Sequence, residues 1–352
     1  MVGLGTFFAI IACLGAWADR QLLDTGNWVH TSDQLIADPA IQTALASYVS
    51  TQLISSPQTV QKIRSALPAK AGPLAGPLAG ALGDVANRMT LRLLETKQFQ
   101  KLWETTNRLT HQQLVKVVNG QGRFKNGAVV LDLRPFNGAV AKRLGVNANL
   151  TGSPDGRIVI VKPKQLSAVQ NGVKLLRTVR WVSLALTVLL FAGAIALAED
   201  RWRAVLSAGA GLVVAALIVL VVRRVLGHVA VHSITNDGPT KPAADSVWQI
   251  ATSLLRTIAI SGLILGLIAM AGAWFAGPAR WAVSARRWTA PVLRDSPAIV
   301  FGAVGIVLLV LLLTGLLPTS GTAIGALAYI VVIAAGVFLL RRQIVREFPA
   351  GQ

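Results

Sequence analysis

The hydrophobic residues of this chain gather in long runs on both sides of a polar segment, residues 20–178. A helix needs about 20 predominantly apolar residues to cross the hydrocarbon core of a bilayer. After the polar segment, five runs approach that length without a charged side chain. The expected spans are 181–198, 204–222, 257–276, 298–317 and 322–340. The pattern therefore predicts a helical membrane bundle over residues 179–343, followed by a short tail, 344–352.

Residues 2–18 form one more apolar run, and two interpretations of it remain open. As a membrane anchor, the run is at the short end of the length that spans a bilayer. As a signal sequence, it ends in Ala16-Trp17-Ala18, the spacing of small residues that a signal peptidase accepts, although no basic residue precedes it. An anchor in segment 1–19 is favoured and gives six spans, whereas cleavage leaves five. Both interpretations send the polar segment across the membrane.

The polar segment is predicted to be mostly helical. Asp38-Pro39 has the pattern of a helix start, because the carboxylate caps free N–H groups and proline fits the first turn. Thr96 is the expected cap of a later helix, whose apolar residues keep helical spacing as far as Asn119-Gly120. Between these helices, residues 71–82 repeat Gly-Pro-Leu-Ala. Repeated Gly-Pro interrupts regular structure, so this stretch is predicted to be a loop or hinge.

A different pattern follows the second helix. Residues 128–133 and 157–162 have the alternation and β-branched content of strands, and 136–144 suits a short helix between them. The expected unit is β-α-β, with a strand direction that the pattern leaves open. The predicted fold class is thus a membrane all-α helical bundle joined to an extracytoplasmic, mainly helical α+β domain, residues 20–178.

The orientation follows from Lys and Arg in the short loops, which favour the cytoplasmic side. Nine arginines lie on one side: Arg201, Arg203, Arg280, Arg286, Arg287, Arg294, Arg341, Arg342 and Arg346. Arg223, Arg224 and Lys241 lie on the other, with Arg256 at its border. The first side is therefore expected inside the cell together with the C-terminus, and residues 20–178 outside. The cluster Lys174, Arg177 and Arg180, just before the first span of the bundle, opposes this orientation.

Tryptophan and glycine suggest how the spans meet their surroundings. Six tryptophans are expected at the membrane interface, where amphipathic rings gather: Trp17, Trp181, Trp202, Trp274, Trp281 and Trp288. Two Gly-x-x-x-Gly motifs allow helix backbones to approach closely: Gly262 with Gly266, and Gly321 with Gly325. Packing within the bundle is favoured over a dimer contact for both motifs.

Candidate chemistry is sparse. His228 and His232 are four residues apart, so on a helix they share a face and form a weak candidate for a metal site. Two histidines without a metal is the favoured interpretation. The spans also lack the buried charges with which transporters and pumps form polar pathways. The sequence indicates no catalytic motif and no cofactor, and a non-enzymatic protein is expected.

The net charge indicates partners. The chain carries 34 basic and 15 acidic residues, a net charge of +19, and 21 basic against eight acidic residues lie between Arg20 and Arg180. A basic surface favours anionic lipid, an acidic envelope polymer or nucleic acid, and an extracytoplasmic location excludes nucleic acid. The lipid bilayer and a protein partner complete the expected partners.

Three stretches carry a resemblance: LDTGNWVHTSDQLIADP at 23–39, FQKLWETTNRLTHQQL at 99–114 and VLDLRP at 130–135. In these stretches and in its order of features, the chain resembles a group of uncharacterised multi-pass membrane proteins of high-GC Gram-positive (actinobacterial) type. The resemblance implies one N-terminal span, a helical extracytoplasmic domain and a cluster of spans. It implies location and layout, and no activity.

These patterns together predict a polytopic plasma-membrane protein, associated with the cell envelope, whose extracytoplasmic domain binds or scaffolds. Two alternatives stay open. One is an accessory subunit of a membrane transport complex, in which a partner supplies the polar pathway. The other is a membrane-bound enzyme acting on lipid-linked envelope polymers.

Overall fold

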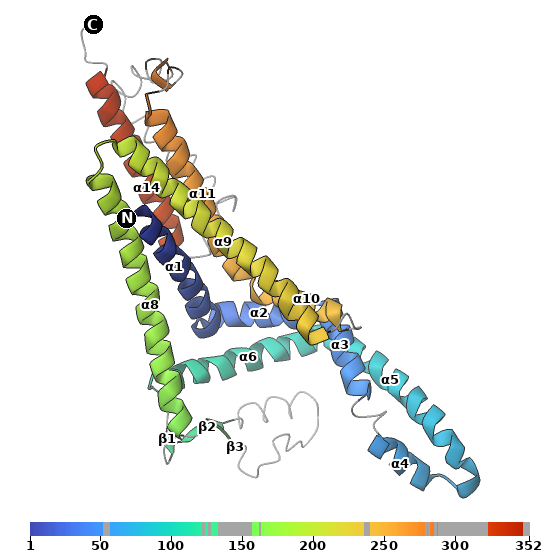
Figure 1. Ribbon diagram of the computed structural model, residues 1–352. Coiled ribbons are helices and arrows are strands. Elements are labelled where there is room, and N and C mark those ends of the chain that lie inside the picture. Colours follow the sequence, from blue (N-terminus) through green and yellow to red (C-terminus); the bar gives the residue numbers. More distant parts are fainter. Residues whose placement is uncertain are drawn as a thin grey trace. The chain divides into compact units, whose positions relative to one another are not determined.

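The computed structural model describes residues 1–51, 57–121, 124–125, 128–132, 157–161, 163–235, 240–278, 280, 282–284, 287 and 323–347. The chain divides into two compact units. One, here called the apolar unit, comprises Met1–Asp19, Leu176–Val225 and Thr252–Gln352. The other, the polar unit, comprises Arg20–Leu175 and Leu226–Ala251. The described residues are predominantly helical, and the apolar runs of the sequence account for the longest helices (Figure 1).

Long apolar helices supply the apolar unit: α1 (Val2–Leu23), α8 (Pro163–Ala196), α9 (Arg201–Thr235), α11 (Ser253–Ala276) and α14 (Ala323–Glu347). Four of them are long and apolar enough to cross a membrane, over Val2–Leu23, Ser167–Ala196, Arg201–Ser233 and Ser253–Ala276. The predicted spans 181–198, 204–222 and 257–276 fall on α8, α9 and α11. The run 322–340 falls on α14, whose described apolar core is shorter, and 298–317 lies outside the described residues.

Two apolar clusters hold helices of this unit together. Buried Val219, Leu255 and Ala259 bring α9 and α11 together, and residues of α1 pack against them. The second cluster centres on Tyr329 of α14, which packs against Ile264, Leu265 and Ile268 of α11. The Tyr329 hydroxyl donates a hydrogen bond of 2.8 Å to the Ser261 carbonyl. This bond gives the phenol a partner where water is scarce, as a polar group in an apolar environment requires.

Helices α9 and α11 approach most closely at two glycines. A Cβ atom placed on Gly266 of α11 would lie 2.7 Å from the Gly209 carbonyl oxygen, and one placed on Gly209 would lie 2.9 Å from the Gly266 carbonyl oxygen. Neither position has room for a side chain, so backbone meets backbone there. Gly262 has nothing within 4 Å of the same built atom. The contact thus joins one glycine of the predicted motif to a glycine on the neighbouring helix.

The polar unit is built from helices α2 (Thr25–Ala37), α3 (Pro39–Val49), α4 (Pro57–Ala66), α5 (Ala75–Glu95), α6 (Lys97–Val118) and α10 (Lys241–Ala251), with a 3₁₀ helix, η2, at Ala69–Leu74. Helix α2 packs along α6, α3 along α5, and α10 against both α2 and α3. The last turns of α9 also belong to this unit, and there the Trp248 indole lies directly over Gly227. Residues 226–251 lie between the expected spans 204–222 and 257–276, and they are largely helical.

The helix starts expected at Asp38 and Thr96 are confirmed. An Asp38 carboxylate oxygen accepts hydrogen bonds from the backbone N–H groups of Ala40, at 2.9 Å, and Ile41, at 3.2 Å. The Thr96 hydroxyl accepts one from Phe99 N–H at 3.2 Å, and α6 ends at Val118, one residue before Asn119. Each side chain satisfies donors that the first turn of a helix leaves free.

The loop predicted for residues 71–82 is wrong. These residues form the end of η2 and the first turns of α5. Pro77 is the third residue of α5, where a missing N–H costs nothing because first-turn N–H groups have no partner within the helix. Buried Ala75, Ala79 and Gly83 then anchor one face of α5. The glycines that suggested a hinge are not the packed residues, because Gly76 and Gly80 have nothing within 4 Å of a built Cβ atom.

A small antiparallel sheet completes the described fold. Its strands β1 (Phe124–Lys125), β2 (Ala128–Asp132) and β3 (Arg157–Val161) lie in the order β1-β2-β3. Val130 is opposite Val159 and Asp132 is opposite Arg157, with an irregularity between Val129 and Val130. Strands β2 and β3 fall where the alternation of the sequence predicted strands. Their antiparallel pairing excludes a parallel β-α-β crossover, and the helix expected at 136–144 lies outside the described residues.

The glycine contact generates the first prediction. Gly266→Ala should lower the free energy of unfolding of the detergent-solubilised chain by about 1–3 kcal/mol, because the added methyl forces the two backbones apart. Gly262→Ala is the matched control, because it shares the gain of about 1 kcal/mol in helix propensity and meets no neighbour. Thermal unfolding followed by circular dichroism measures both variants. Equal midpoints for the two would contradict the close approach.

Candidate functional site

The strongest polar constellation in the described residues lies between α2 and α6 of the polar unit, whose helices run side by side (Figure 1). We call it the seam. Its members are Thr25, Trp28, Ser32, Trp103, Asn107 and His111. On each helix they recur at spacings of three or four residues, which places them on a single face. The seam joins two parts of the chain that are more than 70 residues apart.

In the seam, indole, amide and hydroxyl groups form hydrogen bonds with one another. Trp28 Nε1–H donates to Asn107 Oδ1 at 3.3 Å, and the Asn107 amide nitrogen donates to Ser32 Oγ. Trp103 Nε1–H is shared between Ser32 Oγ, at 3.0 Å, and the Ser32 carbonyl, at 3.3 Å. Ser32 is buried and receives donors from two side chains of α6. Such a network fixes the register of the two helices more strictly than apolar contact alone.

His111 closes one end of the seam and is only 3% exposed. The Leu22 carbonyl can only accept, so His111 Nε2–H donates to it at 3.1 Å. Nδ1 then accepts from the Thr25 hydroxyl at 3.1 Å, which assigns the tautomer. Burial lowers the pKa of His111, against smaller opposing effects of the Leu22 hydrogen bond and Asp24. The ring also stacks on Trp28, with centroids 4.9 Å apart and planes inclined by 18°.

This geometry favours a structural histidine over a catalytic one. Both ring nitrogens are engaged, and the lowered pKa keeps the ring neutral near neutral pH. A metal ligand or general base needs a free lone pair directed at its target. Nδ1 of His111 offers one only if the bond from Thr25 breaks.

Two carboxylates border the seam. Burial raises the pKa of Asp33 on α2, and the negative charge of Glu104 on α6 raises it further, while Arg108 and His30 oppose the shift. Asp33 Oδ1 is buried and has no hydrogen-bond partner among the described residues. Glu104 is held instead by Arg108, one turn away on α6, at 2.9 Å. Asp33 therefore holds a proton more readily than an exposed aspartate.

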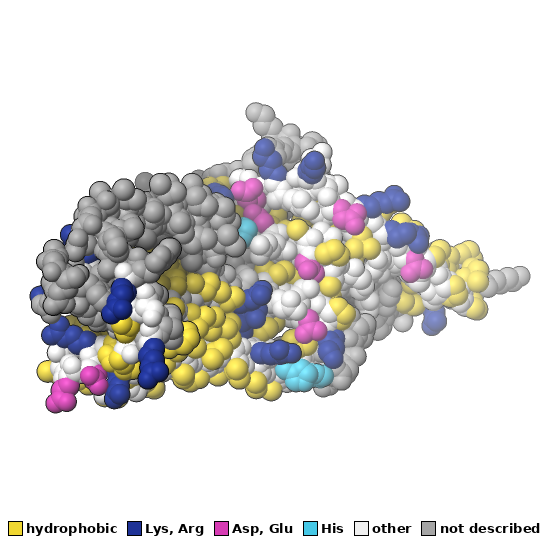
Figure 2. Space-filling view, turned by 90° about the horizontal axis from the view of Figure 1, so that it is seen from above, with side chains coloured by type: hydrophobic (Ala, Val, Ile, Leu, Met, Phe, Trp, Pro, Cys, Tyr) yellow, Lys and Arg dark blue, Asp and Glu magenta, His cyan; other side chains and the backbone are white. Residues whose placement is uncertain are grey.

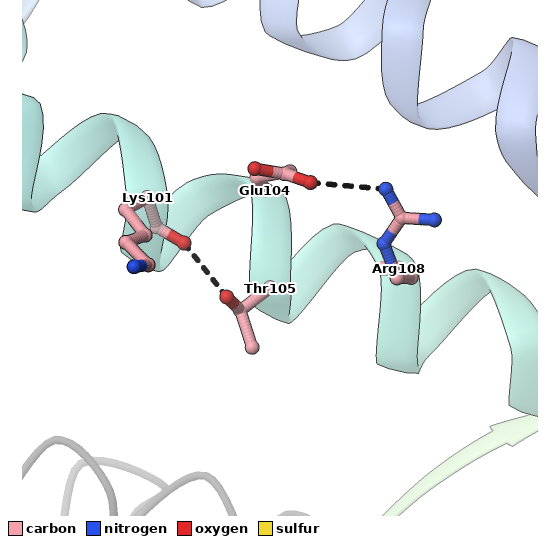
Figure 3. Close-up of polar contacts among 4 residues, drawn as sticks. All are labelled: Lys101, Glu104, Thr105 and Arg108. Carbon is pink, nitrogen blue, oxygen red and sulfur yellow. Dashed lines mark hydrogen bonds and ion pairs between the residues drawn. The ribbon is translucent and has the colours of Figure 1, made fainter.

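Outside the seam, α6 carries polar side chains that are half-exposed or exposed, four of which are drawn in Figure 3. There Glu104 pairs with Arg108, and the Thr105 hydroxyl donates to the Lys101 carbonyl at 2.8 Å. Exposed ion pairs of this kind add little to stability. The seam thus fixes α6 against α2 and leaves charged groups of both signs beside it accessible to solvent.

A second polar contact, in the apolar unit, ties α1 to α8. The Asp19 carboxylate bonds to the Arg180 guanidinium and lies 3.6 Å from Arg177 Nε. The side chains of Asp19 and Arg180 are only 13% and 19% exposed. The Arg180 guanidinium also lies 4.9 Å from the Trp181 ring centroid, in a cation–π arrangement. A Cβ atom on Gly15 would lie 3.3 Å from the Arg180 Cα atom, so the two helices are close together here.

The six predicted interface tryptophans differ in their surroundings. Trp181 and Trp274 are more than half exposed, and Trp202 lies beneath the Arg203 guanidinium, 5.3 Å away. Trp17 instead packs into the cluster around Val219 and Leu255. Trp281 and Trp288 lie outside the described residues.

The other predicted site residues also differ in their contacts. The rings of His228 and His232 meet edge to face, with centroids 4.3 Å apart on α9. In the described part of the chain, no group of three or more His, Cys, Asp or Glu side chains is placed to hold a metal. Of the glycines, Gly266 makes the contact with α9 and Gly262 lies in open space. Gly325 is on α14, and Gly321 lies outside the described residues.

Sequence analysis did not predict the seam. A signal was present: Trp28 and Ser32 are four residues apart, as are Trp103 and Asn107, and Asn107 and His111. Polar residues at helical spacing beside an apolar stripe indicate a buried polar contact. Two of the three stretches that carry the resemblance, 23–39 and 99–114, contain every member of the seam.

The seam predicts a pH dependence of stability. The pKa of His111 is lower in the folded chain than in the unfolded chain, so the unfolded state binds the proton more readily. The stability that this residue contributes is complete above the unfolded pKa of about 6.5 and is lost as the pH falls through the folded pKa. The urea midpoint of the polar unit, followed by near-ultraviolet circular dichroism, should therefore fall on acidification.

His111→Gln should remove this part of the pH dependence, because glutamine does not titrate. The control is His30→Gln, which changes an exposed histidine bonded to Gln34 one turn away. An unchanged pH profile in His111→Gln would show that acid sensitivity arises elsewhere.

The Asp19–Arg180 pair predicts energetic coupling between α1 and α8. A double-mutant cycle of Asp19→Ala and Arg180→Ala should give an interaction energy of about 1–3 kcal/mol, because the two groups are in direct contact. The exposed pair of Asp200 and Arg203, 3.4 Å apart, is the matched control and should give less than about 1 kcal/mol. Additive effects at Asp19 and Arg180, measured by thermal unfolding in detergent, would contradict a stabilising pair.

The chain matched no protein-family model, no curated protein and no solved structure.

Proposed function

We propose that the chain is a multi-pass plasma-membrane protein whose polar unit is a binding or scaffolding module on the extracytoplasmic side of the cell envelope. One observation carries the proposal. In each of the four membrane-length helices, no more than a third of the apolar window is buried inside the protein. Figure 2 shows the corresponding broad hydrophobic surface, with Lys and Arg at its borders. Apolar surface on this scale needs lipid as its solvent.

The polar unit supports a binding role because of how α2 and α6 are held. The seam fixes their register, and the charged face of α6 remains exposed. A rigid helix pair with adaptable charged groups outside is suited to recognising a partner, since little order is lost on binding. The proposed partners are a protein or an acidic envelope polymer, which the basic composition of residues 20–180 favours.

The proposed orientation gains support from Asp19. Arg177 and Arg180 belong to the basic cluster that opposes an extracytoplasmic polar unit, and both contact the Asp19 carboxylate. Their charge is thus partly neutralised where it would otherwise favour the cytoplasm. The proposal includes two further spans, 298–317 and the apolar part of α14, which place the C-terminal arginines inside.

Cysteine labelling in intact cells tests the orientation. The chain has a single cysteine, Cys13, so Cys13→Ser gives a background without thiols. In that background Gln113→Cys, exposed on α6 of the polar unit, should react with a membrane-impermeant maleimide added outside the cell. Glu199→Cys, exposed between α8 and α9, should react only after the membrane is permeabilised.

Each labelling outcome has a distinct meaning. The reverse pattern would overturn the orientation and leave the membrane assignment intact. Labelling of both positions in a fraction that stays soluble without detergent would overturn the membrane assignment itself.

A further inference from the structure

Helix α5 inverts the usual relation between size and burial. The side that packs inside the polar unit carries mostly small residues, Ala75, Ala79 and Gly83, and Leu94 is the one large side chain among its buried residues. Long apolar side chains project outward next to them, each between 39% and 67% exposed: Leu74, Leu78, Leu82, Val85, Met89 and Leu93. We call these six residues the α5 stripe. A fold that needed them only for its own core would bury them before alanine.

The α5 stripe is continuous. At about 100° per residue, its six side chains fall within an arc of about 100°, and they extend over about 28 Å of helix axis. This is the width of the apolar face of an amphipathic helix that is covered along its whole length. Contiguous exposed apolar surface of this kind marks a binding face.

Basic residues lie beside the α5 stripe. Arg88 and Arg92 are exposed at its edge, closer to it in helical angle than either Asp84 or Glu95. Helix α4, which packs on α5, adds exposed Lys62 and Arg64 and carries no acidic residue. In Figure 2, hydrophobic and basic side chains lie next to one another over α4 and α5, at the right of the view.

Aliphatic side chains bordered by arginine and lysine fit one partner best. We propose that the α5 stripe lies in the surface of an anionic lipid bilayer, with Arg88 and Arg92 bound to lipid headgroups. Interfacial helices have this composition: leucine and methionine enter the acyl boundary, while basic side chains extend to the phosphates. The inference rests on the proposed membrane location, because the long apolar helices keep a bilayer permanently available to the polar unit.

Lipid quenching on the full chain tests this inference. A single cysteine at Leu82, in the Cys13→Ser background, carries an environment-sensitive fluorophore. The protein is reconstituted in phosphatidylcholine vesicles, with or without phosphatidylglycerol, that contain a nitroxide-labelled lipid. The fluorophore at Leu82→Cys should be quenched by the lipid nitroxide in the anionic vesicles, and its emission should shift to the blue.

Two matched positions keep the result interpretable. Thr105→Cys, on the exposed polar face of α6, should stay unquenched by lipid in every vesicle. Leu189→Cys, 67% exposed within α8, should be quenched in all of them. Quenching at Leu189 without quenching at Leu82 overturns the inference and leaves the proposed function standing. Absence of quenching at both overturns the proposed function as well.

Charge reversal separates lipid from a second copy of the chain. Arg88→Glu with Arg92→Glu should cut the membrane-inserted fraction at Leu82 sharply, since each arginine near an anionic surface changes partitioning about fivefold. Both side chains are exposed, so the fold should tolerate the change. If the Leu82 fluorophores are not reached by lipid and instead self-quench in proportion to protein density, a second copy covers the stripe and the lipid assignment is wrong.

Discussion

The structure depends on apolar helix surface that the described part of the chain leaves uncovered. Helices α1, α8, α9 and α11 each carry a membrane-length apolar stretch, of which no more than a third is buried inside the described part of the protein. In water, such surface would drive aggregation, because exposed apolar area costs about 25 cal/mol per Å². In lipid, exposed apolar area carries no such cost. The remaining requirement is that each helix satisfies its own backbone hydrogen bonds. The long helices, scarce interior charge and small packing residues all follow from this one condition.

The two units solve the problem of holding helices together in different ways. Where the surroundings are apolar, burying more hydrocarbon offers little gain, so α9 and α11 rely on the direct approach of Gly209 to Gly266. The polar unit joins α2 to α6 through indole and amide donors. Each of those donors would be costly to leave unpaired. The seam therefore excludes other registers of the helix pair.

Local signals predicted the fold where the controlling interaction was itself local. Asp38 and Thr96 cap helices through atoms two or three residues away, and the apolar runs need only their own length. The loop predicted at 71–82 was wrong because the effect of Pro77 depends on where the helix begins. Packing of Ala75 and Ala79 sets the start of that helix. The seam escaped prediction because nothing in the spacing within α2 indicates that Trp28 pairs with Asn107, 79 residues later. The direction of the β2–β3 pair was unreadable for the same reason.

The ion pair between Asp19 and Arg180 has a consequence for how the two units are connected along the chain. The chain leaves the apolar unit after Asp19 and returns to it at Leu176. The ion pair of Asp19 with Arg180 holds these two points of the chain close together. The intervening segment is thus an insertion with neighbouring ends, and it supplies the larger of the two chain segments of the polar unit. A short flexible linker in its place would span the gap and leave α1 and α8 paired. Any replacement segment would also have to restore the contacts that α10 makes with α2 and α3.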